Sequence, residues 1–279
     1  MFIAAVVIYG TIGPFVRFID APSEVVVLIR GIVGSLTIAA VIAFRGHGLD
    51  IEGIHKNLVW LVGTGLCLGF NWVALFAAYK YTSIAIASLC NYTAPIIVVV
   101  LSSLFFGERL TPLRAACVAA AMLGIVLVSG VIGADAASFD PLGIGLGLLS
   151  AAGFVGIVIC NRFVSAMDNL SRVLVQLAVA AAVVLVFVLF SHHGIPLPGN
   201  AISWAFCLLL GVVHTGAAYI LWFGAQPHLP LQEIALLGYV EPVMSVVLSA
   251  VILGEPLSVL GMFGAALVLG AAAMSEVAD

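Results

Sequence analysis

Apolar runs of about twenty residues recur along the chain, and short polar or turn-forming stretches separate them. Within each run the hydrophobic residues are nearly continuous and do not alternate with polar ones. A helix needs about 20 apolar residues to cross the roughly 30 Å hydrocarbon layer of a membrane, whereas a membrane strand alternates over about 10 residues. The pattern predicts an all-α integral membrane protein with ten transmembrane helices, at residues 1–19, 24–44, 57–79, 83–106, 111–131, 141–162, 172–191, 201–225, 231–253 and 256–275.

The composition agrees with this pattern and excludes several classes of protein. Hydrophobic residues make up 64% of the chain and charged residues 8%, the formal net charge is −4, and the mean hydropathy is +1.30. A soluble domain has roughly 25% charged residues, because its surface must face water. We therefore do not expect a cytosolic enzyme, a nucleic-acid-binding protein or a disordered protein, and the weak acidity indicates no charged partner.

Basic residues are distributed unequally between the two predicted membrane faces. Ten spans place both termini on one face, and the positive-inside rule makes the face with more Lys and Arg the cytoplasmic one. The first run begins without a basic lead, so we expect a membrane span there rather than a secretory signal. The terminal face, predicted to be cytoplasmic, carries Arg45, Lys56, Arg109, Arg114, Arg162 and Arg172, against Arg17 and Lys80 on the other.

Two stretches that lie 147 positions apart resemble each other without a gap. Tyr92-Thr-Ala-Pro95 matches Tyr239-Val-Glu-Pro242, and Gly107-Glu108-Arg109-Leu110 matches Gly254-Glu255-Pro256-Leu257, where each Glu is expected to cap the following helix. Nine of the nineteen positions from 92 to 110 are identical. The unit holds five spans, an odd number, so its second copy enters the membrane from the opposite face. We predict two inverted five-helix repeats, 1–131 and 141–275, an arrangement that builds transporters with a site near the midplane.

Proline-bearing fourth and ninth spans that close in Gly-Glu-x-Leu resemble the drug/metabolite transporter superfamily, and the chain is similar to its EamA-type branch. Glu241-Pro242 matches the Glu-Pro common in the second half of that branch, and Arg30 resembles an arginine often present in its second span. The resemblance implies a carrier in the bacterial inner membrane that exports amino acids or other small metabolites by alternating access. Its ten-span members include exporters of aromatic amino acids. Spans eight to ten contain no Lys or Arg, which disfavours the branches that carry phosphorylated substrates.

Glu241 is the sharpest functional candidate, because it lies near the middle of the ninth span. A charged side chain there costs on the order of 3 kcal/mol even on the gentlest insertion scale. Glu241 is therefore expected to bind a substrate amine, to carry a coupling proton, or to serve as a structural carboxylate. His214 in the eighth span is open to the same roles, as a substrate ligand, a proton relay or a neutral structural imidazole. Arg30 is expected to form a gating or structural ion pair, with outward snorkelling or the binding of a carboxylate as the alternatives.

Aromatic and amide residues in both halves are candidates for the walls of a central cavity. Trp72 aligns with Tyr219 under the offset of 147, and Trp222 lies on the same side of an ideal helix as His214. Pro95 and Pro242 are predicted hinges, since each frees the carbonyl four residues earlier, on Asn91 and Gly238. The predicted substrate site comprises Asn71, Trp72, Asn91, Tyr92, His214, Tyr219, Trp222, Tyr239 and Glu241, with plain helix packing as the alternative interpretation.

No motif in the sequence predicts chemistry on a substrate, a metal site or a cofactor. There is no HExxH, GxSxG or Walker sequence, and the five cysteines are scattered without metal-ligand spacing. We expect a small-molecule substrate and the lipid bilayer as partners, no nucleic acid, and a monomer. The alternatives are an exporter of drugs or nucleobases from the same superfamily and, from other classes, a channel or a membrane-embedded enzyme.

Overall fold

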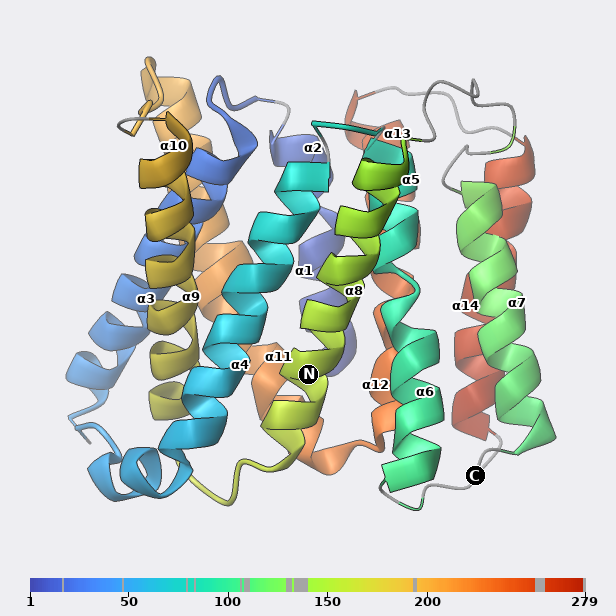
Figure 1. Cartoon of the computed structure of the whole chain (residues 1–279), viewed down its shortest axis with the longest axis horizontal. Coiled ribbons are helices and arrows are strands. Elements are labelled where there is room, and N and C mark those ends of the chain that lie inside the picture. The colour runs from blue at the N-terminus through green and yellow to red at the C-terminus, as the bar shows by residue number, and fades with distance from the viewer. Residues whose placement is uncertain are drawn as a thin grey trace.

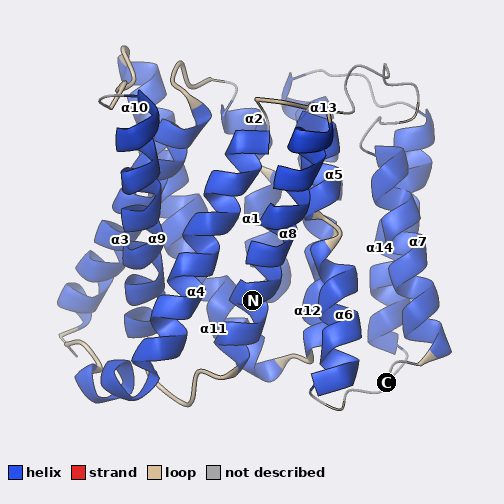
Figure 2. Ribbon diagram, in the orientation of Figure 1, coloured by secondary structure: helices blue, strands red, loops and turns tan. Residues whose placement is uncertain are grey.

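The computed structural model describes residues 1–16, 18–46, 48–78, 80–82, 84–105, 107, 111–128, 132, 140–192, 195–253 and 259–277. Within these ranges the chain is helical and has no β-strand, as the apolar runs predicted (Figure 2). Six helical stretches there are long and apolar enough to cross a membrane, and two further apolar helices are shorter. Glu108 and Glu255, the predicted helix caps, lie outside the described residues, as does Arg17.

The described helices form ten transverse segments between the upper and lower edges of the molecule (Figure 1). Six segments are single helices: α3 (Ser23–Arg45), α4 (Ile51–Ala78), α7 (Pro112–Val128), α8 (Pro141–Arg162), α9 (Asn169–His192) and α14 (Val259–Val277). The first segment is α1 (Phe2–Gly10) with α2 (Ile12–Val16), and the fourth is α5 (Ile84–Asn91) with α6 (Ala94–Phe105). The eighth comprises α10 (Ala201–Leu209), the π-helix η2 (Leu210–Ala217), α11 (Ala218–Ala225) and the 3₁₀-helix η3 (Gln226–His228), and the ninth is α12 (Leu231–Gly238) with α13 (Val240–Leu253).

The fourth and ninth segments are interrupted at equivalent positions. The first break is the turn at Tyr92-Thr93, just before Pro95, and the second is Tyr239, just before Pro242. Proline lacks an N–H and its ring clashes with the carbonyl four residues earlier, which explains why the helical hydrogen bonding stops ahead of it. For Pro242 only the backbone is described. Figure 1 shows that α5–α6 runs downward through the bundle, whereas α12–α13 runs upward.

Helices from the two halves of the chain interlock rather than forming separate bodies. α8 packs against α4 and α5, while α1 packs against α11 and α13. α3 packs against η2 and α9 against α4, and three pairs (α3 with α9, α6 with α12, and α7 with α14) also lie in contact. At the level of whole transverse segments, each of these contacts maps under the 147-residue offset onto another of them or onto itself. Residues from both halves therefore meet in the middle of the bundle.

Two glycines allow α4 to lie directly against α9. A Cβ atom on Gly65 would lie 2.6 Å from Cβ of Val179 and 2.7 Å from the carbonyl oxygen of Gln176, and one on Gly69 would lie 2.6 Å from Cβ of Val183. Small residues four positions apart let membrane helices approach this closely. The close packing fixes where α4 runs through the bundle, and with it the position of the side chains that α4 carries inward.

Two linked aspartate caps tie the α3–α4 and α8–α9 loops together at the lower edge. Asp50 precedes α4, and its carboxylate accepts hydrogen bonds from the backbone N–H groups of Gly53 (2.8 Å) and Asp168 (3.0 Å). Asp168 in turn accepts from the backbone and the hydroxyl of Ser171, at 2.8 and 2.9 Å, and the Ser171 hydroxyl accepts from the Asp50 N–H at 3.0 Å. An acidic N-cap satisfies helix-terminal N–H groups. The cap explains why α4 begins at Ile51, ahead of the predicted span start at residue 57.

The Asp50 cap predicts an acid-sensitive contribution to stability. Hydrogen bonds from Asp168 and Gly53 hold the pKa of Asp50 below its ordinary value. The folded state therefore binds this proton less readily than the unfolded state, so the stabilisation is complete above the unfolded pKa of about 3.9 and is lost as the pH falls through the lower folded value. We expect Asp50→Ala to lower the apparent melting temperature at pH 7. Below pH 4 the difference in melting temperature between the variant and wild type should become smaller. Glu52→Ala, on the exposed side of the same helix turn, is the control; an equal effect of both variants would contradict the prediction.

Candidate functional site

A cluster of buried aromatic rings from α1, α4 and α11 occupies the interface between the two halves. The ring of Tyr9 lies 5.7 Å from the rings of Tyr219 and Trp222, and the ring of Trp72 lies 6.4 Å from that of Tyr219. Phe2 stacks on Trp222 at 4.3 Å. These spacings are those of stacked and edge-to-face aromatic pairs. The structure thus brings together Trp72, Tyr219 and Trp222 of the predicted site and adds Tyr9, which the repeat comparison had not singled out.

Two charged side chains belong to this aromatic cluster. The guanidinium carbon of Arg30, on α3, lies 5.1 Å from the centroid of the Trp72 ring, which is a cation–π distance, and its Nε donates a hydrogen bond to the Thr215 hydroxyl at 3.2 Å. Glu241, in the first turn of α13, interacts electrostatically with Arg30 and with the Tyr9 and Tyr219 hydroxyls. A cation from the first half therefore contacts the rings, and an anion from the second half lies within electrostatic range of the same residues.

His214 lies in the π-helix η2 and faces the first segment of the bundle. Its Nε2 is 2.6 Å from Oγ1 of Thr11, the residue between α1 and α2, and its ring meets Phe15 edge-on at 5.5 Å. Its Nδ1 is 3.4 Å from the carbonyl oxygen of Leu209, five residues earlier. Trp222 also faces the first segment, so these two residues share a side as the helical angle predicted. π-Helical turns are rare and occur frequently at functional sites.

Asn71 and Asn91 lie in a separate network of amide groups, outside the aromatic cluster. Nδ2 of Asn71 donates to Oδ1 of Asn91 at 3.0 Å and to the carbonyl oxygen of Ser150 at 2.7 Å. The Ser150 hydroxyl also donates to Oδ1 of Asn91, at 3.0 Å. These bonds join α4, α5 and α8 beside the α5–α6 break. They occupy the amide donors of Asn71 and the amide oxygen of Asn91. The network supports the broken helix, and a substrate contact by either asparagine remains a prediction.

Tyr239 connects the two interrupted segments. Its side chain is fully buried, and its hydroxyl donates a hydrogen bond to the carbonyl oxygen of Tyr92 at 3.0 Å. The sequence pointed to free carbonyls on Asn91 and Gly238; the carbonyl that receives this side-chain donor belongs to Tyr92, because the break spans two residues rather than a single kink. A carbonyl released at membrane depth needs a partner. Equivalent residues of the two halves thus tie the breaks to each other.

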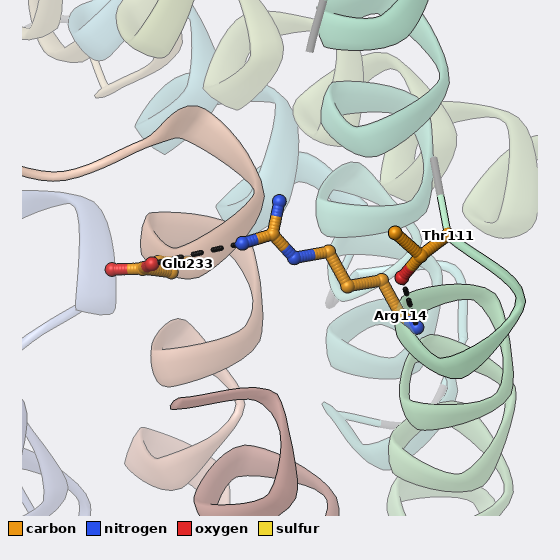
Figure 3. Close-up of polar contacts among 3 residues, drawn as sticks. All are labelled: Thr111, Arg114 and Glu233. Atoms are coloured by element: carbon orange, nitrogen blue, oxygen red, sulfur yellow. Dashed lines mark hydrogen bonds and ion pairs between the residues drawn. The ribbon is translucent and has the colours of Figure 1, made fainter. Parts of the chain in front are cut away.

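An ion pair joins α7 to α12 near the lower edge (Figure 3). Nη2 of Arg114 lies 3.9 Å from Oε1 of Glu233, and the Arg114 N–H donates to the Thr111 hydroxyl at 3.2 Å. Both charged side chains are largely buried, with 11% and 15% of their surfaces exposed. The positions equivalent to Arg114 and Glu233 in the other half are Gly261 and Ile86, which cannot form such a pair. The pair therefore stabilises the α7–α12 contact without an equivalent on the upper side.

Comparison with known proteins assigns these features to a family. The EamA-like transporter family matches residues 1–130 and, a second time, residues 141–276. The chain belongs to the EamA-like transporter family. It is thus a multi-pass membrane transporter, and its two interrupted segments lie one in each matched region.

Two named exporters and a solved structure are similar over most of the chain. The aromatic amino acid exporter YddG of Ancylobacter novellus is 30% identical over 226 residues, covering 78% of this chain and 75% of that protein. The pseudopaline exporter CntI of Pseudomonas aeruginosa is 26% identical over 192 residues, covering 69% and 64%. A crystal structure that is 22% identical superimposes with a TM-score of 0.80 and covers 98% of this chain and 95% of that one, which shows a shared fold.

Proposed function

We propose that this transporter exports amino acids with aromatic or other apolar side chains across the bacterial inner membrane. The observation that carries the proposal is that Arg30 lies over Trp72 of the buried aromatic cluster and interacts electrostatically with Glu241. An amino acid is a zwitterion, so its carboxylate complements Arg30 and its ammonium complements Glu241, while Trp72 and Tyr219 pack against an apolar side chain. A neutral nucleobase or a cationic drug would leave at least one of these charges without an opposite partner.

The proposed mechanism is alternating access by two inverted five-helix repeats, 1–131 and 141–275. The breaks at Tyr92-Thr93 and Tyr239, the offset-related helix contacts and the double family match support it. Rocking of one repeat against the other would bend the chain near Pro95 and Pro242, with the Tyr239–Tyr92 hydrogen bond at the crossing. The excess of basic residues on the lower side favours a cytoplasmic location for both termini. We further propose that the carrier works as a monomer, without a cofactor or a nucleic-acid partner.

The direction of transport is proposed by analogy with relatives. Two of them carry the names of exporters, one of aromatic amino acids and one of pseudopaline. A site that holds both charges of a zwitterion is compatible with proton coupling through Glu241 or His214 and with facilitated diffusion. The direction in a cell would then follow from the solute gradient or from the coupled proton.

Counterflow in proteoliposomes tests this function. Vesicles loaded with unlabelled phenylalanine should accumulate external labelled phenylalanine transiently, and internal leucine or tryptophan should replace phenylalanine as the driver. Internal adenine or ethidium should not drive accumulation of labelled phenylalanine. If internal adenine or ethidium drives accumulation of the label and no internal amino acid does, the result would favour the drug or nucleobase exporter. Flux that neither saturates nor responds to internal solute would indicate a channel.

A further inference from the structure

A second group of polar side chains lies away from the aromatic cluster, at the lower ends of α8, α9 and η3. Asn169, Arg172 and Gln176 follow helical spacing on α9 and share one face. Asn161 of α8 donates a hydrogen bond to Oε1 of Gln226 and accepts one from Nε2 of Gln176 at 3.2 Å. Asn161 therefore links the polar face of α9 to Gln226 of η3.

Four polar atoms in this group have no hydrogen-bond partner among the described residues. They are Oδ1 of Asn169, Nε of Arg172, Oε1 of Gln176 and Nε2 of Gln226. Gln226 is only 5% exposed, Arg172 4% and Gln176 0%. An unsatisfied buried polar group costs about 1–3 kcal/mol, and in native proteins ordered water or a ligand normally meets such groups. Their concentration at one place therefore indicates a site that receives a polar solute.

A cavity of about 210 Å³ is lined by two members of this polar group, Gln226 with its unpartnered Nε2 and Asn161, and has two unlike walls. Gln226, Asn161 and Arg162 give it amide and guanidinium donors, while Val158, Val164, Pro227 and Ile234 make up its apolar wall. A more open hollow of about 370 Å³ shares Arg162 and Pro227 and continues past His228 and Pro230. Pockets for drug-sized ligands measure roughly 300–1,000 Å³. The inner cavity is therefore suited to a solute smaller than a typical drug.

We propose that this cavity is a separate capture site for a small carboxylate with an apolar body. The carboxylate would accept hydrogen bonds from Nε2 of Gln226 and from the Arg162 guanidinium, and the apolar body would pack against Val164 and Ile234. Among the described residues, those that line the cavity include donors and a cation but no Asp or Glu, so a cationic amine finds no counter-charge there. Transfer of the solute from this cavity to the aromatic cluster rests on the proposed function. Binding of the solute in the cavity does not depend on that function.

The probe that tests this site is labelled phenylacetate, which has the required carboxylate and apolar body but lacks the ammonium group of an amino acid. Purified full-length protein in lipid nanodiscs should bind it saturably, and phenylacetamide or benzylamine should compete at least 10-fold less well. Gln226→Glu replaces the donor by a like charge and should weaken binding at least 10-fold. Arg162→Gln, at an exposed side chain that can be changed without repacking, should weaken it at least threefold. Arg45→Gln, a basic residue outside the cavity, is the control and should leave binding within twofold.

The arms of this experiment separate the capture site from the central site. Loss of phenylacetate binding in Trp72→Ala, with binding retained in Gln226→Glu and Arg162→Gln, would place the probe at the aromatic cluster and overturn the proposal. Absence of saturable binding would overturn it as well. Phenylacetate binding that responds to Gln226 and Arg162, in a protein that shows no amino acid counterflow, would support the cavity and refute the proposed transport function.

Discussion

Replacing Arg30 by methionine is expected to reduce amino acid counterflow by at least about 100-fold, or roughly 2.7 kcal/mol of lost stabilisation. The variant removes the proposed carboxylate ligand, the cation over Trp72 and the donor to Thr215 at once. It also leaves Glu241 without the cation with which it interacts inside an apolar bundle. An anion that loses its compensating cation inside an apolar bundle destabilises the folded state. Initial rates of labelled phenylalanine exchange and the apparent melting temperature measure the two effects separately.

A double substitution separates binding from folding at this position. Arg30→Met combined with Glu241→Met removes both charges, so we expect it to recover much of the melting temperature that either single variant loses. It should not recover exchange, because neither charge of the zwitterion then has a partner. Arg30→Lys keeps the charge without the planar fork and should retain part of the activity. Exchange that survives in the double variant would remove the Arg30–Glu241 pair from the proposed site, as would a Glu241→Gln variant with unchanged rate and pH dependence.

The helical fold could be predicted from the sequence because a membrane leaves few alternatives. Each apolar run is long enough for a span and must satisfy its backbone internally, which specifies helices almost without reference to side-chain detail. The breaks in the fourth and ninth segments were predictable for a similarly local reason, the missing N–H of Pro95 and Pro242. The exact turn residues, Tyr92-Thr93 and Tyr239, depend on tertiary contacts such as the hydrogen bond between them.

The site was only partly predictable, because helix faces depend on neighbours that periodicity does not reveal. Trp72 and Asn71 are adjacent in the sequence, yet Trp72 meets the aromatic cluster while Asn71 bonds to Asn91 and Ser150 on the other side. The position of His214 depends on the π-helix η2, which has no sequence signal that we could identify. Gln226 lies one residue beyond the eighth predicted span and belongs to no motif that singles it out. The polar face of α9, where Gln176 interrupts an otherwise apolar run, is the sequence feature that could have indicated this polar group.

The close contact between α4 and α9 at Gly65 and Gly69, called the α4–α9 seam below, leads to a second prediction with a large expected effect. Gly65→Leu should destabilise the protein by about 3 kcal/mol and abolish exchange. Even a Cβ atom at this position would lie 2.6 Å from Cβ of Val179 and 2.7 Å from the backbone oxygen of Gln176. A backbone oxygen in a packed helix cannot move aside as a side-chain end can, so the helices must separate. Trp72 lies two helical turns further along α4, and separation of α4 from α9 would displace it from Tyr219 and Arg30. Gly65→Ala should show the same change with a smaller loss, on the order of 1–2 kcal/mol.

Gly145 provides the matched control for this steric argument. It also lies inside a long helix, α8, but an added Cβ there would meet no atom of the described residues within 4 Å. Removing a glycine from a helix interior gains roughly 0.5–1 kcal/mol in backbone entropy, and Gly65→Ala and Gly145→Ala share this gain. The two variants therefore differ in packing alone, and Gly145→Ala should melt at or slightly above the wild-type temperature with normal exchange. A Gly65→Ala variant that melts as high as Gly145→Ala would show that α4 and α9 do not lie as close in the membrane as the seam requires.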